Sequence, residues 1–384
     1  MPAFNSRIHQ ALADREQQGL RRSLQVLDRS NQTLLAQRGQ RYVNFSSNDY
    51  LGLASDAALV HAWQQGLSLY GCGSGASPLV TGFGEAHQTL ERTLCEWLGF
   101  ERAVLFGSGF SANQALLFTL LQKGDLLLQD KLNHASLMEA GLLSSAQMKR
   151  FQHNDVAHLT RLLDEQVATL VVTEGVFSMD GDQAPLAEIQ AALGSNAWFA
   201  VDDAHGVGVL GERGAGSCQA AGIKPQALVV TFGKAFGLSG AAILCDAALG
   251  DYLTQFARHH VYSTAMPPAQ AHALTHAAGM IQGEAWRRDK LTELSALYHE
   301  LLRDVPGFVA TQTPIKPFVL GSAQRALHVA SAMREAGLWM TAIRPPTVPS
   351  GSARLRITLT AHHTPQQVQQ MADTLKQCVE ASHE

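Results

Sequence analysis

Short apolar runs alternate with helical patterns through the middle of this chain. The apolar runs predict strands over residues 103–106, 126–129, 169–173, 197–201, 227–232 and 241–244. Apolar residues at helical spacing predict helices over residues 113–121 and 186–193. Because the strands are apolar on both faces and helices come between them, the pattern indicates a largely parallel sheet covered on both sides. The expected fold class is therefore α/β.

The two ends of the chain have a different pattern. Residues 7–28 place leucine and isoleucine at mostly helical spacing and predict one amphipathic helix, followed by a short strand over 41–45. Towards the C-terminus we expect helices over 291–302 and 325–336 beside strands over 318–320 and 353–358. These patterns predict an N-terminal helix and strand, a large α/β domain and a smaller α+β domain, over residues 1–45, 46–285 and 286–384.

Composition and charge exclude several classes of partner. The 384 residues carry a net charge of -4, so a basic surface for nucleic acid or an anionic membrane is not expected. No run reaches the roughly 18 apolar residues of a membrane span, and the N-terminus lacks a signal-peptide core. The five cysteines form no C-x-x-C pair and the 16 histidines include no H-E-x-x-H, so we expect no metal site. Together these features favour a cytoplasmic protein.

Three polar clusters directly follow predicted strands. Asp202 and His205 follow the run WFAV, Thr231 and Lys234 follow ALVV, and Ser178 follows TLVV by a few residues. Because the carboxyl ends of parallel strands meet at one edge of a sheet, we expect these five side chains to converge on one crevice.

Lys234 is the residue with the most specific chemistry in this group. A lone lysine is usually exposed, a lone Asp202 could cap a helix, and a lone His205 could belong to the core. Together they fit a pyridoxal 5′-phosphate (PLP) site, because a desolvated lysine is nucleophilic and an aspartate satisfies the pyridinium nitrogen.

Two glycine-rich stretches need separate interpretations. Residues 107–113 (GSGFSAN) lie between a strand and a helix, where backbone N–H groups and the helix dipole favour a phosphate. Residues 206–211 (GVGVLG) match the dinucleotide fingerprint, but the following ERGAGS does not open a helix. The first stretch is therefore the better phosphate candidate, and a nicotinamide enzyme is the weaker alternative.

The segments 202–206 (DDAHG) and 231–234 (TFGK) resemble the α-oxoamine synthase family of fold-type I PLP-dependent transferases. The resemblance covers essentially the whole chain. Further matching stretches are 44–52 (NFSSNDYLG), 133–136 (NHAS), 173–182 (TEGVFSMDGD), 262–268 (YSTAMPP) and 353–360. Two departures stand out, since some relatives carry arginine within residues 77–79 (SPL) and often glycine at Ala235.

The resemblance implies roles for individual residues. Lys234 is expected to carry PLP as a Schiff base and later to remove the Cα proton of the amino acid. Asp202 is expected to pair with the pyridinium nitrogen, His205 to contact the phenolic oxygen, and His134 to stack over the ring. The further cofactor contacts implied are Gly109, Phe110, Ser178 and Thr231. The substrate contacts implied are Arg21, Asn48, His134, Thr347 and Arg356. Outside this resemblance, His134, Asn48 and Arg356 could equally be a loop cap, a turn residue and a strand ion pair.

The resemblance also implies substrates and an oligomeric state. Residues 341–349 (TAIRPPTVP) and 20–22 (LRR) are most similar to members that join L-alanine to a pimeloyl thioester in biotin biosynthesis, with loss of carbon dioxide. The thioester carrier is CoA or an acyl-carrier protein, and the family implies a homodimer with active sites at the interface. Two alternatives remain at this point: a sister synthase that uses glycine and a short acyl-CoA, and a PLP-binding protein without activity.

Overall fold

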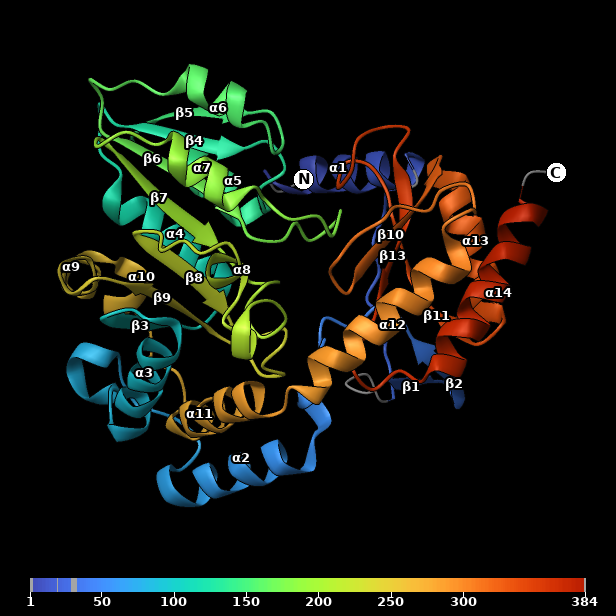
Figure 1. Cartoon of the computed structure of the whole chain (residues 1–384), viewed down its shortest axis with the longest axis horizontal. Helices are drawn as coiled ribbons and strands as arrows, with labels where there is room; N and C mark the ends of the chain where they lie inside the picture. Colours follow the sequence, from blue (N-terminus) through green and yellow to red (C-terminus); the bar gives the residue numbers. More distant parts are fainter. Residues whose placement is uncertain (1–2, 19, 29–32, 383–384) are drawn as a thin grey trace.

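The structure, a computed structural model, describes residues 3–18, 20–28 and 33–382 (Figure 1). Figure 1 shows two lobes: the larger contains a seven-stranded sheet, and the smaller contains two three-stranded sheets. No helix of the described residues is long and apolar enough to cross a membrane.

The large lobe is built on a mostly parallel sheet. Its strands are β3 (Arg102–Phe106), β4 (Leu126–Asp130), β5 (Gln147–Phe151), β6 (Thr169–Glu174), β7 (Ala197–Asp202), β8 (Ala227–Thr231) and β9 (Ala241–Cys245). The spatial order is β3-β9-β8-β7-β6-β4-β5, and β9 runs antiparallel to both of its neighbours. The prediction of a largely parallel sheet and of six of these strands is therefore confirmed, whereas β5 was not predicted from the sequence.

Helices cover both faces of this sheet. Along β7, Phe199 and Val201 enter one core cluster and Ala200 enters the other, as the two-residue period of a strand requires. The face of Ala200 is covered by α4 (Gly109–Leu120), α5 (Ala135–Leu143) and α9 (Ala247–Phe256). The opposite face is covered by α3 (Glu85–Leu98), α6 (Val156–Leu162), α7 (Leu186–Ala192) and α11 (Pro268–Gly283). The other helices of this lobe are α2 (Ala57–Tyr70), which packs on α11, and the short α8 (Ser217–Ala220) and α10 (Arg258–Val261).

The small lobe combines the two ends of the chain. One antiparallel sheet has the order β10 (Ile315–Gly321), β13 (Ala353–Thr358), β12 (Thr341–Ile343), and it packs with α12 (Trp286–Leu302), α13 (Ala323–Glu335) and α14 (Pro365–Ala381). The second sheet joins β1 (Leu34–Gln37) and β2 (Gln40–Asn44) to β11 (Leu338–Trp339). Because β2 runs parallel to β11, the first strands of the chain lie beside its last third.

The helix predicted over residues 7–28 is wrong in its second half. Helix α1 spans Asn5–Gln17, and residues 20–28 are not helical. Gly19 lies outside the described residues. Leu24 is 99% exposed, whereas Leu27 packs against the small cluster of Leu35, Tyr42 and Trp339. The contact of Leu27 with β1, β2 and β11 therefore overrides the helical spacing of the leucines.

Candidate active site

A cavity of about 450 Å³ lies where β6, β7 and β8 end. The expected site residues that line it are Asn48, Gly109, Phe110, His134, Ser178, Asp202, His205, Thr231, Lys234 and Arg356. The convergence expected from the parallel strands is confirmed, since residues from three neighbouring strand ends share one cavity.

Lys234 lies in the turn that follows β8. Gly237, at a φ of 69°, donates its N–H to the Lys234 carbonyl at 2.9 Å and closes this turn. Burial lowers the pKa of the Lys234 amine although Asp202 and Glu174 oppose the shift. Lys234 is therefore no solvent-facing loop lysine, and its amine is more often neutral and nucleophilic than that of an exposed lysine.

Asp202 is the last residue of β7, and its side chain is buried. Its Oδ2 accepts a hydrogen bond from Asn113 Nδ2 at 2.7 Å, and its Oδ1 accepts one from the backbone N–H of Ala204 at 3.0 Å. These two donors fix the orientation of the Asp202 carboxyl group towards the cavity. Such a carboxylate suits a protonated ring nitrogen as its partner.

Tyr50 orients the His205 ring through a hydrogen bond to Nδ1. The Tyr50 hydroxyl lies 2.6 Å from His205 Nδ1, and both side chains are buried. Burial raises the pKa of Tyr50 to about 12, so the phenol keeps its proton and donates it to Nδ1. Burial also lowers the pKa of His205 well below its usual value. The lowered pKa favours neutral His205, and a neutral ring whose Nδ1 accepts the Tyr50 hydroxyl carries its proton on Nε2.

His134 begins helix α5 and caps it. Its Nδ1 accepts the backbone N–H of Ser136 at 3.2 Å, and the Ser136 hydroxyl lies 2.8 Å from the same nitrogen. Burial lowers the pKa of His134. The loop-cap alternative and the cofactor role are thus compatible, because the cap uses Nδ1 and leaves Nε2 without a hydrogen-bond partner among the described residues.

The phosphate-type turn has the expected position. Ser108 caps helix α4, and its Oγ accepts the N–H of Ser111 at 3.1 Å. A Cβ built on Gly109 meets the Thr231 methyl group at 2.5 Å, so glycine is needed for this close approach. The hydroxyl of Thr231 is buried and lacks a hydrogen-bond partner in the part of the chain that the structure describes. The helix N-terminus and this free hydroxyl therefore suit a phosphate.

The cavity as a whole fits PLP. Asn113 Oδ1, Glu174 Oε1 and Thr231 Oγ1 are buried atoms that find no hydrogen-bond partner among the described residues, and their residues all line this cavity. Buried polar atoms are normally satisfied, so three such atoms at one cavity indicate a polar ligand. The same cavity thus offers the Lys234 amine for the aldehyde of PLP, the Asp202 carboxyl group for its ring nitrogen, and Thr231 with the Gly109 turn for its phosphate.

Arg356 reaches this cavity from β13 of the small lobe. Its Nε donates to the Ser178 carbonyl at 2.5 Å, and its Nη1 donates to Asn48 Oδ1 at 3.0 Å. A neighbouring arginine, Arg354, forms an ion pair with Asp180 of the large lobe at 2.5 Å. Arg354 therefore makes the strand ion pair, whereas Arg356 presents a cation to the cavity without a carboxylate among its hydrogen-bond partners in the described chain.

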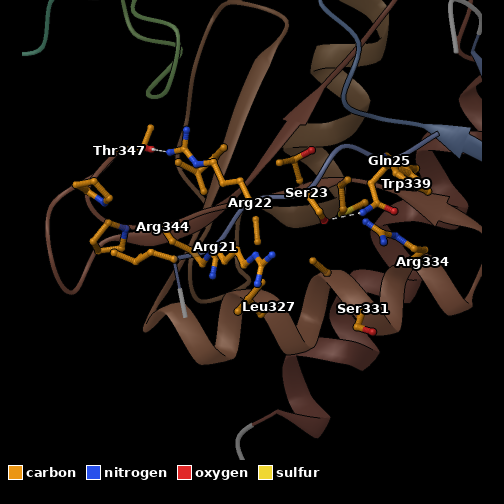
Figure 2. A pocket seen from close by; sticks show the side chains of 18 of the residues that line it. Arg21, Arg22, Ser23, Gln25, Leu327, Ser331, Arg334, Trp339, Arg344 and Thr347 are labelled. Carbon is orange, nitrogen blue, oxygen red and sulfur yellow. Dashed lines mark hydrogen bonds between the residues drawn. The ribbon is translucent and has the colours of Figure 1, made fainter. Parts of the chain in front are cut away.

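Arg21 and Thr347 do not line this cavity. They line a second, open cavity of about 860 Å³ in the small lobe, together with Arg22, Arg334 and Arg344 (Figure 2). Arg21 pairs with Glu16 at 2.8 Å. Arg22 donates to the Thr347 hydroxyl at 3.5 Å, as the dashed line in Figure 2 shows.

The two cavities are neighbours in the fold. Thr341 of β12 lines the second cavity and pairs in register with Arg356 of β13, which lines the first. The two cavities therefore share neighbouring residues of the β12–β13 pair.

The glycines of residues 206–211 have a packing role. A Cβ on Gly206 meets Asp203 Oδ1 at 2.0 Å, and a Cβ on Gly208 meets the Ala235 methyl group at 2.5 Å. Asp203 in turn accepts the hydroxyl of Ser217 at 2.6 Å. No helix of dinucleotide-binding length follows, since α8 has four residues. The room left by Gly208 also explains how Ala235 is accommodated beside Lys234.

Four lining or supporting residues were missed from the sequence: Tyr50, Asn113, Ser136 and Glu174. Each lies inside one of the motifs that carried the family resemblance or the phosphate turn. Their motifs were therefore visible, but the direction of each side chain depends on packing between distant segments.

Comparisons with known proteins agree with this geometry. The family model for aminotransferase class I and II matches residues 40–375. The chain is 68% identical over 382 residues to 8-amino-7-oxononanoate synthase of Vibrio campbellii, covering 99% of this chain and 100% of the relative. It is 69% identical over 377 residues to the protein of the same name from Vibrio cholerae, covering 98% of each chain.

Solved structures of related enzymes have the same fold. Serine palmitoyltransferase of Sphingomonas wittichii is 30% identical with a TM-score of 0.92, covering 100% of this chain and 98% of the other. A high-resolution structure of SPT with PLP as an internal aldimine is 27% identical with a TM-score of 0.90, covering 99% of this chain and 98% of the other. 8-amino-7-oxononanoate synthase of Francisella tularensis is 30% identical with a TM-score of 0.80, covering 89% and 99%. The chain therefore belongs to the aminotransferase class I and II family of fold-type I PLP enzymes and, within it, to the 8-amino-7-oxononanoate synthases.

Proposed function

We propose that the cavity at the ends of β6, β7 and β8 is where this 8-amino-7-oxononanoate synthase holds PLP, with Lys234 as the point of attachment. The observation that carries the proposal is that the amine of Lys234, with its lowered pKa, and the buried carboxylate of Asp202 line one cavity. When bound, PLP supplies an electron sink for a carbanion at the amino-acid Cα. The enzyme is a PLP-dependent acyltransferase of biotin biosynthesis.

Lys234 has a second role in this proposal. Once the incoming amino acid has displaced it, its Nζ is free and, because burial favours the neutral form, it removes the Cα proton. Asp202 keeps the ring nitrogen protonated, since its own oxygens are fixed by Asn113 and Ala204. His205 donates from Nε2 to the phenolic oxygen, because Tyr50 occupies Nδ1.

The remaining cofactor contacts are proposed from their positions. Thr231 and the Gly109 turn hold the phosphate, because the threonine hydroxyl is buried without a partner and the helix N-terminus lies beside it. Phe110 and Ser178 line the same cavity and contact the ring. His134 stacks over the ring from the start of α5.

The amino acid is L-alanine, and its carboxylate is bound by Arg356, Asn48 and His134. A guanidinium suits a carboxylate because it can donate two parallel hydrogen bonds. Arg356 is 8% exposed, so this attraction is less screened than at the surface.

The second substrate is a pimeloyl thioester of CoA or of an acyl-carrier protein. Arg21 and Thr347, which line the second cavity (Figure 2), bind the acyl part. Condensation breaks the thioester bond and releases the thiol of the carrier, and loss of carbon dioxide then gives 8-amino-7-oxononanoate.

The enzyme works as a homodimer with residues 71–75 and 263–264 near the partner's active site. Large exposed apolar side chains flank both segments: Val80 is 73% exposed and Tyr262 is 79% exposed. Such a surface is typical of an interface between subunits. Light scattering of the purified protein tests this part, and a monomer at micromolar concentration contradicts it.

Paired product assays test the assignment of substrates. We expect faster product formation from L-alanine and pimeloyl-CoA than from glycine with acetyl-CoA or succinyl-CoA. The wild type should show a visible absorption band with PLP, and Lys234→Ala should lose both the band and the activity. Faster turnover of a glycine pair contradicts the substrate assignment, and a wild type that gains no band with added PLP contradicts the role of Lys234.

A further inference from the structure

A buried chain of hydrogen bonds links Asp202 to His134. Asn113 Nδ2 lies 2.7 Å from Asp202 Oδ2 and 2.9 Å from Ser136 Oγ. Ser136 Oγ lies 2.8 Å from His134 Nδ1. Asn113 is 1% exposed and Ser136 is 0% exposed, so water does not compete for these bonds. The chain thus connects the proposed partner of the ring nitrogen with the imidazole on the opposite wall of the cavity.

The chemistry of each group fixes the direction of these bonds. The amide nitrogen of Asn113 has two hydrogens, and it gives one to Asp202 and one to Ser136. The hydroxyl oxygen of Ser136 is therefore an acceptor from Asn113, and its own hydrogen points to His134 Nδ1. The backbone N–H of Ser136, which can only donate, reaches the same Nδ1 at 3.2 Å.

Two donors converge on His134 Nδ1, so that nitrogen carries no hydrogen. Its single ring proton then lies on Nε2, the nitrogen without a partner among the described residues. Burial and the positive charge of Lys234 favour neutral His134, and the negative charge of Asp202 opposes them. Glu174 further restrains the position of His134, because the Glu174 carboxyl group accepts a hydrogen bond from the backbone N–H of His134.

We propose that Asn113 and Ser136 are positioning residues that hold His134 as the neutral tautomer with its proton on Nε2, so that His134 meets the bound amino acid as a hydrogen-bond donor and not as a base. This inference rests on the proposed function of the cavity. To act as a base, His134 must accept a proton at Nδ1, where two donors stand, or at Nε2, which already has one. Proton removal therefore stays with Lys234.

Nitrogen NMR of the ¹⁵N-histidine-labelled full chain tests the tautomer without measuring activity. In the wild type, with and without PLP, we expect a pyrrole-type signal for Nε2 and a pyridine-type signal for Nδ1 of His134 near neutral pH. The signals are assigned by their loss in His134→Gln. A proton on Nδ1, or a doubly protonated ring, overturns the proposal.

Variants test the role of the two positioning residues. Ser136→Ala and Asn113→Ala should each bind L-alanine about tenfold more weakly, as read from the visible absorption change of the PLP-loaded enzyme, because His134 is no longer held in one orientation. In Ser136→Ala the tautomer preference of His134 should also weaken. The matched control is Ser144→Ala, which removes a hydroxyl bonded to the Gly141 carbonyl at the other end of α5; it should leave both readouts unchanged.

The outcomes separate this proposal from the proposed function. If Ser136→Ala keeps wild-type L-alanine binding and the same histidine signals, Ser136 is only structural and the proposal is wrong. If the wild type makes no 8-amino-7-oxononanoate yet shows the Nε2–H tautomer, the assignment of the reaction fails while the tautomer stands. If it makes product but carries the proton on Nδ1, only the positioning role is overturned.

Discussion

Glu174 and Asp202 end adjacent parallel strands in register, and the two carboxyl groups are satisfied differently. Both oxygens of Asp202 accept hydrogen bonds, whereas Glu174 Oε1 has no partner. Burial raises the pKa of Glu174 well above its usual value, and the charge of Asp202 raises it further. The raised pKa favours the neutral form of Glu174 beside Asp202, and this limits the negative charge at the end of the cavity where both residues lie.

Glu174→Gln should remove a pH dependence of stability. Because the folded pKa of Glu174 lies above its usual value of 4.5, the folded state keeps a proton that the unfolded state releases. Stability from this proton is fully present below pH 4.5 and is lost as the pH rises. Thermal unfolding of the protein without PLP should show Glu174→Gln at least about 2 °C above the wild type near pH 8, with a smaller difference near pH 4.5. The exposed Glu165→Gln is the control, and parallel pH curves for wild type and Glu174→Gln contradict a protonated Glu174.

Lys316→Met should also remove a pH dependence of stability, but one of opposite sign to that of Glu174. Lys316 is 0% exposed in the small lobe, its Nζ donates to the Thr311 carbonyl at 2.8 Å, and burial lowers its pKa to about 7. Between that value and the usual 10.5, the unfolded chain holds a proton that the folded chain lacks, so stability rises with pH over this range.

The melting temperature measures this effect. From about pH 7 to pH 9 we expect the wild type to gain at least about 2 °C relative to Lys316→Met. The exposed Lys149→Met should follow the wild type. Equal pH responses of wild type and Lys316→Met show that the buried amine stays charged.

Gly109→Ala should weaken PLP binding about tenfold or more. The added Cβ meets the Thr231 methyl group at 2.5 Å, so either the helix start or the threonine must move away from the proposed phosphate site. Titration of the protein with PLP, followed by absorption, measures the affinity. Gly194→Ala is the control because its Cβ meets no atom within 4 Å. Unchanged affinity in Gly109→Ala places the phosphate elsewhere.

Tyr50→Phe should lower turnover about tenfold with little effect on the substrate KM. The phenol is the donor to His205 Nδ1, and without it the proton of His205 is free to move from Nε2 to Nδ1. Steady-state kinetics and the pH dependence of the visible PLP band measure the change. A wild-type band and turnover in Tyr50→Phe rule out this role for the phenol.

The strands and the main catalytic candidates were predictable from local sequence. Strands buried on both faces leave continuous apolar runs, and Asp202 and Lys234 come at or just after the ends of two of them. Once the sheet is parallel, the convergence of these residues needs no further information. The family resemblance then identified the reaction, because its motifs span the whole chain.

Other features depended on tertiary structure. Residues 20–28 have helical spacing, yet Leu27 packs against the small-lobe cluster instead. Arg356 and Asn48 lie 308 positions apart in the chain and form a hydrogen bond. Asn113 is linked to His134 by hydrogen bonds through Ser136. The sequence by itself determined the sheet and the positions of Lys234 and Asp202 at its strand ends, because apolar burial and strand ends are local properties. Only the tertiary structure decided the hydrogen-bond partners of the site residues, the directions of their pKa shifts and the second cavity, because burial and hydrogen-bond partners come from segments distant in the chain.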